Sequence, residues 1–165
     1  MKLNSLHDLY LLELQDLYNS ENQIIKALPK MAEESSSVEL RSAFEEHLEQ
    51  TKGHVRRLEE IFGMLGEKAK GEKCEGMEGI LDEGKDLMKE EATPMVKDAG
   101  LISAAQRVEH YEIAAYGCVR TYAEQLGHKD AARLLQLTLD EERETDKKLT
   151  AIAESRINTE AVRTA

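Results

Sequence analysis

Apolar residues recur at steps of three and four along the first third of the chain, the pattern of one face of an α-helix. The residues in this stripe are Leu6, Tyr10, Leu14, Leu17, Ile24 and Leu28. Glu21 stands where an apolar residue would continue the stripe. The pattern predicts a helix over residues 5–33. Pro29 predicts a kink or a new turn near its end, because proline lacks the amide hydrogen of the helical bond.

A second apolar stripe runs along the same helix. Leu11, Tyr18 and Ile25 lie about 80° round the helix from the first stripe, as a period of 3.6 residues requires. A helix that is apolar on two faces needs two partners. We therefore predict a homodimer with these residues at or near the contact, or a covering segment from elsewhere in the chain.

The second helix has its own start and stop signals. Ser36, followed three residues later by Glu39, has the spacing of a capping box. Gly63 and Gly66 are typical of a helix end. These signals predict a helix over residues 37–65.

Two more long helices are predicted in the second half of the chain. Thr93 followed by Pro94 is typical of a helix start, with threonine as N-cap and proline at the first helical position. Gly127 is the expected C-cap. The predicted helices span residues 94–126 and 129–156.

A long connection of different character joins the two halves. Residues 66–93 hold half of the chain's ten glycines, yet Cys74 to Met88 keeps helical spacing. We expect a crossover that contains a short extra helix. The tail beyond Arg156 is polar and is expected to fray.

This order of hairpin, crossover and hairpin predicts an all-α fold: one antiparallel four-helix-bundle domain over residues 1–165. The composition agrees, because hydrophobic residues make up 41% of the chain and aromatic residues only 4%. A chain of 165 residues is long enough to bury a core of this kind.

Charge and cysteine content narrow the partners. A net charge of −11 would repel nucleic acid. The apolar stretches are too short to cross a membrane. Cys74 and Cys118 are too far apart for a redox or zinc pair, and two lone thiols fit a reducing compartment. The sequence therefore predicts a cytoplasmic protein without a nucleic-acid or membrane partner.

Each of the four long helices carries a residue able to bind metal on its apolar face. These residues are Glu21 in the first helix, His47, Thr51 and His54 in the second, Glu109 and Glu112 in the third, and Glu142 and Asp146 in the fourth. Counting from the two hairpin turns puts them at one level of the bundle. Five buried carboxylates cannot all stay ionised without protons or cations. Oxygen-rich ligation with imidazole suits iron or manganese. The alternative is that the acids are half-exposed and paired with Lys or Arg.

Several segments resemble a known family. They are LQDLYNSENQIIKAL, EEHLEQTKGHVRRLEEIF, KCEGMEGIL, AAQRVEHYEIAAYG and YAEQLGHKDAARLLQLTLDEERETDKKL. They are similar to the ferritin-like superfamily and, within it, to the YciF-like group of bacterial stress-associated proteins. The resemblance implies a left-handed antiparallel four-helix bundle with one long crossover, a rubrerythrin-like metal region and a homodimer without an established activity.

The resemblance also implies roles for individual residues. Glu21 matches the lone glutamate of the first helix, and Glu109 with Glu112 matches the paired glutamates of the third. His54 and Glu142 match the histidine and the glutamate of two ExxH motifs.

Two positions depart from the motifs. Thr51 stands where the pattern has glutamate, and Thr145 where it has histidine. We expect Asp146, one residue further, to replace the missing histidine. The predicted metal ligands are therefore Glu21, His54, Glu109, Glu112, Glu142 and Asp146. They would hold one or two ions of iron or manganese.

Two functions follow from these residues. The first is a metal-binding, ferritin-like stress-response protein that reacts with peroxide or oxygen. The second is a non-catalytic, dimeric structural or interaction protein with a vestigial metal site. Whether the protein is an enzyme stays open. Among the remaining candidates, we expect His47 to be a core histidine, His110 to be exposed and Cys74 to be a buried thiol.

Overall fold

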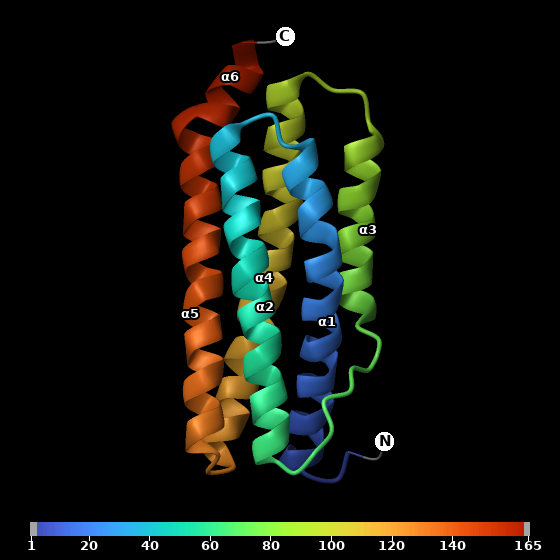
Figure 1. The fold of residues 1–165 in the computed structure, drawn as a ribbon, viewed down its shortest axis with the longest axis vertical. Coiled ribbons are helices and arrows are strands. Elements are labelled where there is room, and N and C mark those ends of the chain that lie inside the picture. The colour runs from blue at the N-terminus through green and yellow to red at the C-terminus, as the bar shows by residue number, and fades with distance from the viewer. Residues whose placement is uncertain (1–2, 164–165) are drawn as a thin grey trace.

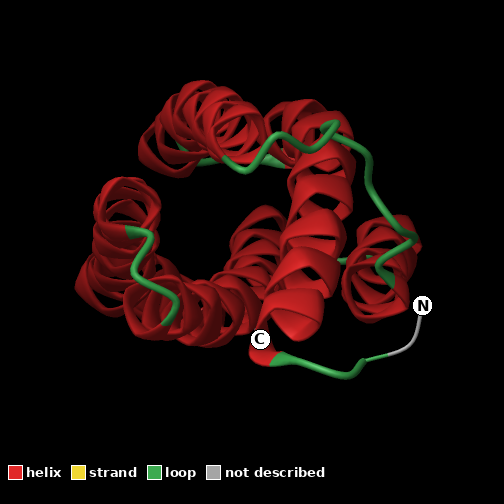
Figure 2. Cartoon of the chain, turned by 90° about the horizontal axis from the view of Figure 1, so that it is seen from below, coloured by secondary structure: helices red, strands yellow, loops and turns green. Residues whose placement is uncertain are grey.

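The computed structural model describes residues 3–163, which contain helices and loops and no strand (Figures 1 and 2). The helices are α1 (Leu6–Glu34), α2 (Val38–Met64), α3 (Glu75–Lys89), α4 (Pro94–Gln125), α5 (Lys129–Ile152), the π-helical turn η1 (Ala153–Ile157) and α6 (Asn158–Arg163). The predicted all-α bundle is confirmed. Helices α1 and α5 run in one direction and α2 and α4 in the other, so neighbouring long helices are antiparallel (Figure 1).

The crossover carries the chain back along the outside of the bundle. It contains α3, which packs on α1 and α4 and returns the chain to the end where α4 begins (Figure 1). Cys74 is the N-cap of α3, and its buried thiol accepts a hydrogen bond from the amide of Met77. The Cys74 carbonyl accepts a second bond from Gln23 of α1. The short extra helix is therefore fixed to the bundle at its first turn.

Both predicted helix ends with glycine have the left-handed backbone that glycine favours. Gly66 has φ 70° and Gly127 has φ 79°. In each case the amide of the residue after the glycine donates a hydrogen bond to a carbonyl in the last turn of the helix. Glu67 donates to the Phe62 carbonyl and His128 to the Ala123 carbonyl, both at 2.9 Å. These are Schellman motifs, and they set the positions where the chain leaves α2 and α4.

The start of α2 differs from the prediction. The N-cap is Ser37, whose hydroxyl accepts a bond from the Leu40 amide at 3.3 Å. Leu40 then occupies the third helical position, so Ser36 and Glu39 form no capping box. The cause lies in α4, because the buried Asp98 carboxylate accepts the amides of Ser36 at 2.9 Å and Ser37 at 2.7 Å.

The structure also bears on two predictions near helix ends. Pro29 starts no new turn, since one helix runs through it to Glu34, and the kink stays a prediction. Pro29 is exposed. Beyond Arg156 the chain does not fray, because η1 turns Ile157 into the core at 1% exposure and α6 continues to Arg163.

The core of the bundle consists of two apolar clusters with a polar layer between them. One cluster includes Ile24, Phe44 and Leu149, near the α1–α2 turn. The other includes Leu17 and Leu139, towards the α4–α5 turn. The predicted metal ligands lie at the level between these clusters.

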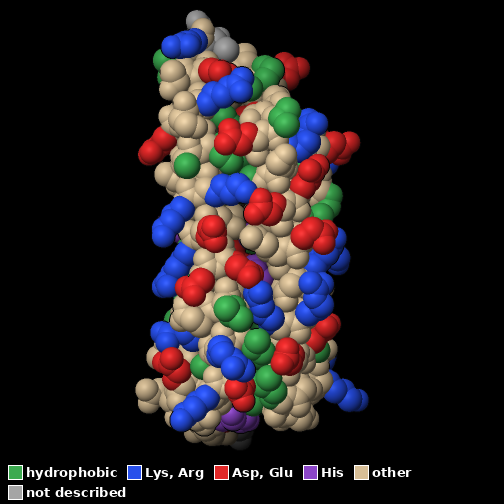
Figure 3. All heavy atoms as spheres, turned by 60° about the vertical axis from the view of Figure 1, so that its left-hand side comes forward, with side chains coloured by type: hydrophobic (Ala, Val, Ile, Leu, Met, Phe, Trp, Pro, Cys, Tyr) green, Lys and Arg blue, Asp and Glu red, His purple; other side chains and the backbone are tan. Residues whose placement is uncertain are grey.

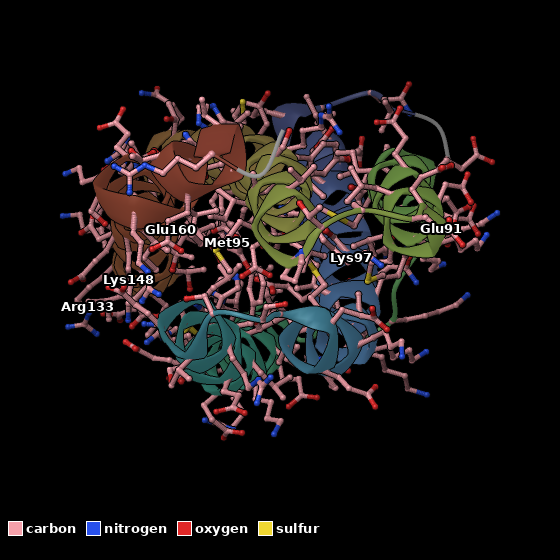
Figure 4. All side chains as sticks on the ribbon, turned by 90° about the horizontal axis from the view of Figure 1, so that it is seen from above. Glu91, Met95, Lys97, Arg133, Lys148 and Glu160 are labelled. Atoms are coloured by element: carbon pink, nitrogen blue, oxygen red, sulfur yellow. The ribbon has the colours of Figure 1, made fainter. Side chains whose placement is uncertain are left out.

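Charged side chains cover the outside of the bundle. The face in Figure 3 intersperses Asp and Glu with Lys and Arg, and Figure 4 shows Arg133 and Lys148 pointing outwards from α5. Lys97 instead lies between helices, where its amine donates to the Met88 carbonyl at 3.0 Å and is 3.9 Å from Glu34 (Figure 4). Among residues 3–163, every helix is too short or too polar to cross a bilayer.

Replacing Asp98 by Ala should destabilise the protein by about 2–4 kcal/mol, because two backbone amides lose a charged acceptor at a buried position. Asp98→Asn should cost less, since its amide oxygen can still accept one bond. Urea unfolding measures both effects. The matched control is Asp140→Asn on the exposed face of α5, which should change the free energy of unfolding by less than about 0.5 kcal/mol. Equal effects of Asp98→Ala and Asp140→Asn would contradict the proposed role of Asp98.

Candidate metal centre

The four long helices bring buried acids and imidazoles together in the polar layer. Glu21, His54 and Glu142 are 0% exposed, and Glu112 is 1% exposed. One ligand atom of each of these four residues lies within 4.8 Å of the others. The Nδ1 atom of His54 is 3.2 Å from Glu21 Oε1 and 2.9 Å from Glu142 Oε1. We call these four residues the central group.

A second group adjoins the first and shares one residue with it. His47, Glu109 and Glu142 also have ligand atoms within 4.8 Å of one another. The Nε2 atom of His47 is 3.2 Å from Glu109 Oε1 and 3.9 Å from Glu142 Oε2. Glu142 therefore directs one carboxylate oxygen to each group, as a bridging ligand would. We call these three residues the His47 group.

The atoms that converge in the two groups lack hydrogen-bond partners. Within the described residues, no bond of suitable geometry reaches Glu21 Oε2, His47 Nε2, His54 Nδ1, Glu109 Oε2, Glu112 Oε2 or either oxygen of Glu142. Buried polar atoms are nearly always bonded, and leaving them unpaired is costly. These atoms therefore need protons or cations.

The other nitrogen of His54 is bonded outside the two groups. Its Nε2 lies 2.9 Å from Glu141 Oε2, and Arg57 donates two bonds of 2.7 Å to the same carboxylate. Burial alone would raise the pKa of Glu141, but the hydrogen bonds from Arg57 and His54 lower it to about 2. An ionised Glu141 accepts the Nε2 proton, so a neutral His54 would direct its Nδ1 lone pair into the central group.

Two hydroxyl groups orient the carboxylates of the central group. Tyr116 donates to Glu21 Oε1 at 2.5 Å, and Ser20 donates to Glu112 Oε1 at 2.9 Å. In both glutamates the bonded oxygen is Oε1 and the unbonded one is Oε2. The pKa of Tyr116 is raised well above its ordinary value by burial and by the charges of Glu21 and Glu112, so its hydroxyl keeps its proton.

Burial shifts the protonation of the acids themselves. It raises the pKa of Glu109 to about 7, and the charge of Glu21 adds to the effect. Burial, followed by the charges of Glu21 and Glu142, raises the pKa of Glu112 well above its ordinary value. The pKa of His54 is lowered by burial but raised further by Glu21, Glu141 and Glu142, and the net shift is strongly upward. Without a metal, the centre would therefore hold protons near neutral pH.

Five of the six predicted ligands lie in these groups, and Asp146 does not. Asp146 is half-buried, and its Oδ1 is 3.0 Å from Nε2 of His110 on α4. Four residues turn an α-helix by about 400°, so Asp146 is about 40° away from Glu142. That offset directs it to the α4–α5 surface, where His110 is 70% exposed as expected.

Three residues at the centre were not among the six predicted ligands. His47 is buried, as expected of a core histidine, and its Nε2 also lies in the His47 group. Its spacing of seven residues from His54 puts both on one face of α2, so the signal was available. Glu141 and Arg57 carried no comparable signal, because their pairing depends on how α2 packs against α5.

The two threonines are not part of either group. The Thr51 hydroxyl donates to the His47 carbonyl at 2.8 Å, and the Thr145 hydroxyl donates to the Glu141 carbonyl at 3.1 Å. Each hydroxyl is therefore bonded to its own helix. The hydroxyl oxygen of Thr145 lies 3.4 Å from Nδ1 of His47. The imidazole of His47 thus lies beside the position where the family motif has a histidine.

Comparison with known proteins agrees with this arrangement. Residues 5–162 match the family model described as a domain of unknown function, DUF892. The chain belongs to this family. It is 42% identical to protein YciF of Escherichia coli K12 over 162 residues, which cover 98% of each chain. The resemblance to the YciF-like group is therefore confirmed, and the fold is consistent with the ferritin-like superfamily.

Three solved structures have the same fold. The crystal structure of the E. coli stress protein YciF aligns with a TM-score of 0.90 at 42% identity, covering 94% of this chain and 98% of that one. YcfI from Rhodopseudomonas palustris aligns with a TM-score of 0.88 at 40% identity, covering 90% and 95%. A Xanthomonas campestris protein, 19% identical with a TM-score of 0.76 over 97% and 99% of the chains, shares the fold alone.

The metal-free protein should lose stability as the pH rises from about 4.5 to 7. Glu109 has a pKa of about 7 when folded and 4.5 ordinarily, so the folded state binds more protons than the unfolded state across this window. Urea unfolding with a chelator present, at pH 5, 6, 7 and 8, should show a decrease of about 2–3 kcal/mol. In Glu109→Gln the decrease should be smaller. Stability that rises through this window would contradict the assignment.

Proposed function

We propose that the protein binds two ions of iron or manganese, one in the central group and one in the His47 group. The observation that carries this proposal is the convergence of unpaired, buried ligand atoms from all four long helices. Each group combines carboxylate oxygens with one imidazole nitrogen, a donor set that suits iron and manganese.

The charges of the two groups fit this proposal. Glu21, Glu109, Glu112 and Glu142, when ionised, carry four negative charges, and two divalent cations carry four positive charges. Both imidazoles would then be neutral, as metal ligands must be. The protons that the metal-free centre holds would be released on binding.

Bound iron or manganese would supply redox chemistry with dioxygen or peroxide. The residues of the chain would orient and enclose the ions. Glu141 fixes the ring of His54, and Tyr116 holds a proton at the edge of the central group. The apolar clusters above and below the layer exclude water, which strengthens every charge interaction between them.

A role in the stress response follows from the relative. The E. coli protein is described as a stress protein, and it matches this chain along nearly its full length. We infer a similar role for this chain as a single ferritin-like domain in the cytoplasm.

One observation favours a second candidate, a structural protein with a vestigial site. Thr51 and Thr145 each replace a ligand of the family motif, and both hydroxyls are bonded within their own helices. The description of the R. palustris relative proposes a structural role. In that case the buried acids would be neutralised by protons.

Protein purified without chelators should contain one or two iron or manganese ions per chain. Glu142→Gln should reduce metal binding in both groups, because Glu142 is shared between them. Removing metal should lower the melting temperature, since a ligand of the folded state stabilises it by mass action. Elemental analysis and thermal unfolding provide the measurements. The matched control is Glu49→Gln on the exposed face of α2, which should leave the metal content and the melting temperature unchanged.

The double variant Glu109→Gln, Glu112→Gln separates the two candidates. Removing two like charges at buried positions should stabilise the metal-free protein by about 1–3 kcal/mol in either case. In a metal protein the same change should abolish the metal-dependent rise in melting temperature and any consumption of peroxide. No metal bound by the unchanged protein, even after reconstitution, would support the scaffold instead.

We also propose a homodimer through the second stripe of α1. Leu11, Tyr18 and Ile25 are half-buried, and α2 covers part of the stripe, because Tyr18 packs edge-on against Phe62 and donates to Glu59 at 3.0 Å. Helix α3 contacts a different side of α1, around Gln23 and Ala27. It therefore does not cover the part of the stripe that α2 leaves exposed. The uncovered area is available to a second copy.

Sedimentation at micromolar concentration should therefore give a dimer. Leu11→Glu should shift the protein towards monomer, because a charge in an apolar contact loses its hydration. Leu137→Glu, at a 48% exposed position on α5, is the matched control and should leave the dimer intact. A monomer in the unchanged protein would remove the basis for the proposal.

A further inference from the structure

A cavity of about 260 Å³ lies between α1, α3 and α4, outside the polar layer of the bundle. Its walls are apolar and include Ala27, Met31, Leu81, Leu101, Ala104 and Val108. Gly84 of α3 and Ala104 of α4 face each other in its wall. A side-chain carbon placed on Gly84 of α3 would be 3.5 Å from the Ala104 side chain of α4.

The charged residues that line the cavity are all cations. They are Lys26 and Lys30 of α1 and Lys85 of α3, and no acid lines it. This bias is unusual on a chain with 33 acids and 22 basic residues. Lys30 is paired with Glu33 and Glu34, and Lys85 with Asp82, each on its own helix. Lys26 makes no ion pair or side-chain hydrogen bond within the described part of the chain, so its charge is available.

We propose that this cavity binds a small carboxylic acid with an apolar body of about eight carbon atoms. An apolar cavity of about 150 Å³ is large enough for benzene, so about 260 Å³ accommodates a somewhat longer chain. Burial of the apolar body supplies most of the affinity. The carboxylate lies at the mouth of the cavity, beside Lys26.

The site is separate from the metal centre. A gap lined by His47, Glu109 and Thr145 adjoins the cavity, but its volume of about 10 Å³ is no larger than one water molecule needs. The residues that line both spaces are Ala27, Met31, Leu81 and Val108. The apolar body therefore ends before it reaches the buried acids. Binding at this site needs no metal, so the proposal does not depend on the proposed function.

The test is a titration of the full-length, metal-free protein with octanoate, followed by calorimetry and by amide chemical shifts. Shifts should concentrate at Ala27, Gly84 and Ala104. Octan-1-ol should bind more weakly, and octylammonium more weakly still, because Lys26 carries an unpaired positive charge at the mouth. Lys26→Gln should weaken octanoate binding about threefold, the size expected for an exposed ion pair, and leave octan-1-ol unchanged. Lys147→Gln on the exposed face of α5 is the matched control and should change neither.

Filling the cavity supplies an independent readout. Ala104→Leu should abolish octanoate binding, and thermal unfolding would show whether this variant is folded. If it is not, the shift map and the three-ligand comparison on the unchanged protein decide the matter. Absence of shifts at the three cavity residues up to the solubility limit of octanoate would overturn the proposal. Equal affinity for octanoate and octylammonium would do the same.

Discussion

The structure depends on the burial of four carboxylates in one layer of a helical bundle. Glu21, Glu109, Glu112 and Glu142 each occupy a position where helical periodicity calls for an apolar side chain, and all are at most 1% exposed. Four charges at such positions would be untenable without neutralisation, since desolvation and mutual repulsion act together. Protons can satisfy this constraint at low pH, and the divalent cations that we propose would satisfy it at higher pH. The stability of the fold would then depend on whether the centre is occupied.

The residues around this layer orient the buried acids but do not neutralise their charges. Arginine and lysine, which could pair with the acids directly, are kept outside: Arg57 bonds to Glu141, which in turn bonds to His54. The positive charge thus acts on the imidazole through an intermediate carboxylate. Direct pairing with arginine would have neutralised a ligand and closed the centre to cations. The apolar clusters on either side of the layer then supply the burial free energy that offsets its cost.

The sequence predicted the features that depend on local spacing. Helical periodicity identified the bundle, and acids at apolar positions of that periodicity identified Glu21, Glu109, Glu112 and Glu142. The predictions that were wrong concern features that depend on contacts between helices. Asp98 moves the N-cap of α2 to Ser37 from a distance of 61 residues in the chain. Asp146 turns towards His110 on α4, an exposed partner that no single helix reveals.

The two threonines can be understood through the same charge constraint. A glutamate at position 51 would add a fifth negative charge to the layer, more than two divalent cations balance. Threonine removes that charge and bonds to its own helix, so it leaves no unpaired group. Threonine at 145 removes an imidazole, but His47 lies beside it, with its Nε2 3.2 Å from Glu109 and 3.9 Å from Glu142. Both groups therefore keep one imidazole each, and the total charge still balances. Simple decay of a metal site has no reason to preserve that balance, and this supports the proposal of two bound ions over that of a vestigial site.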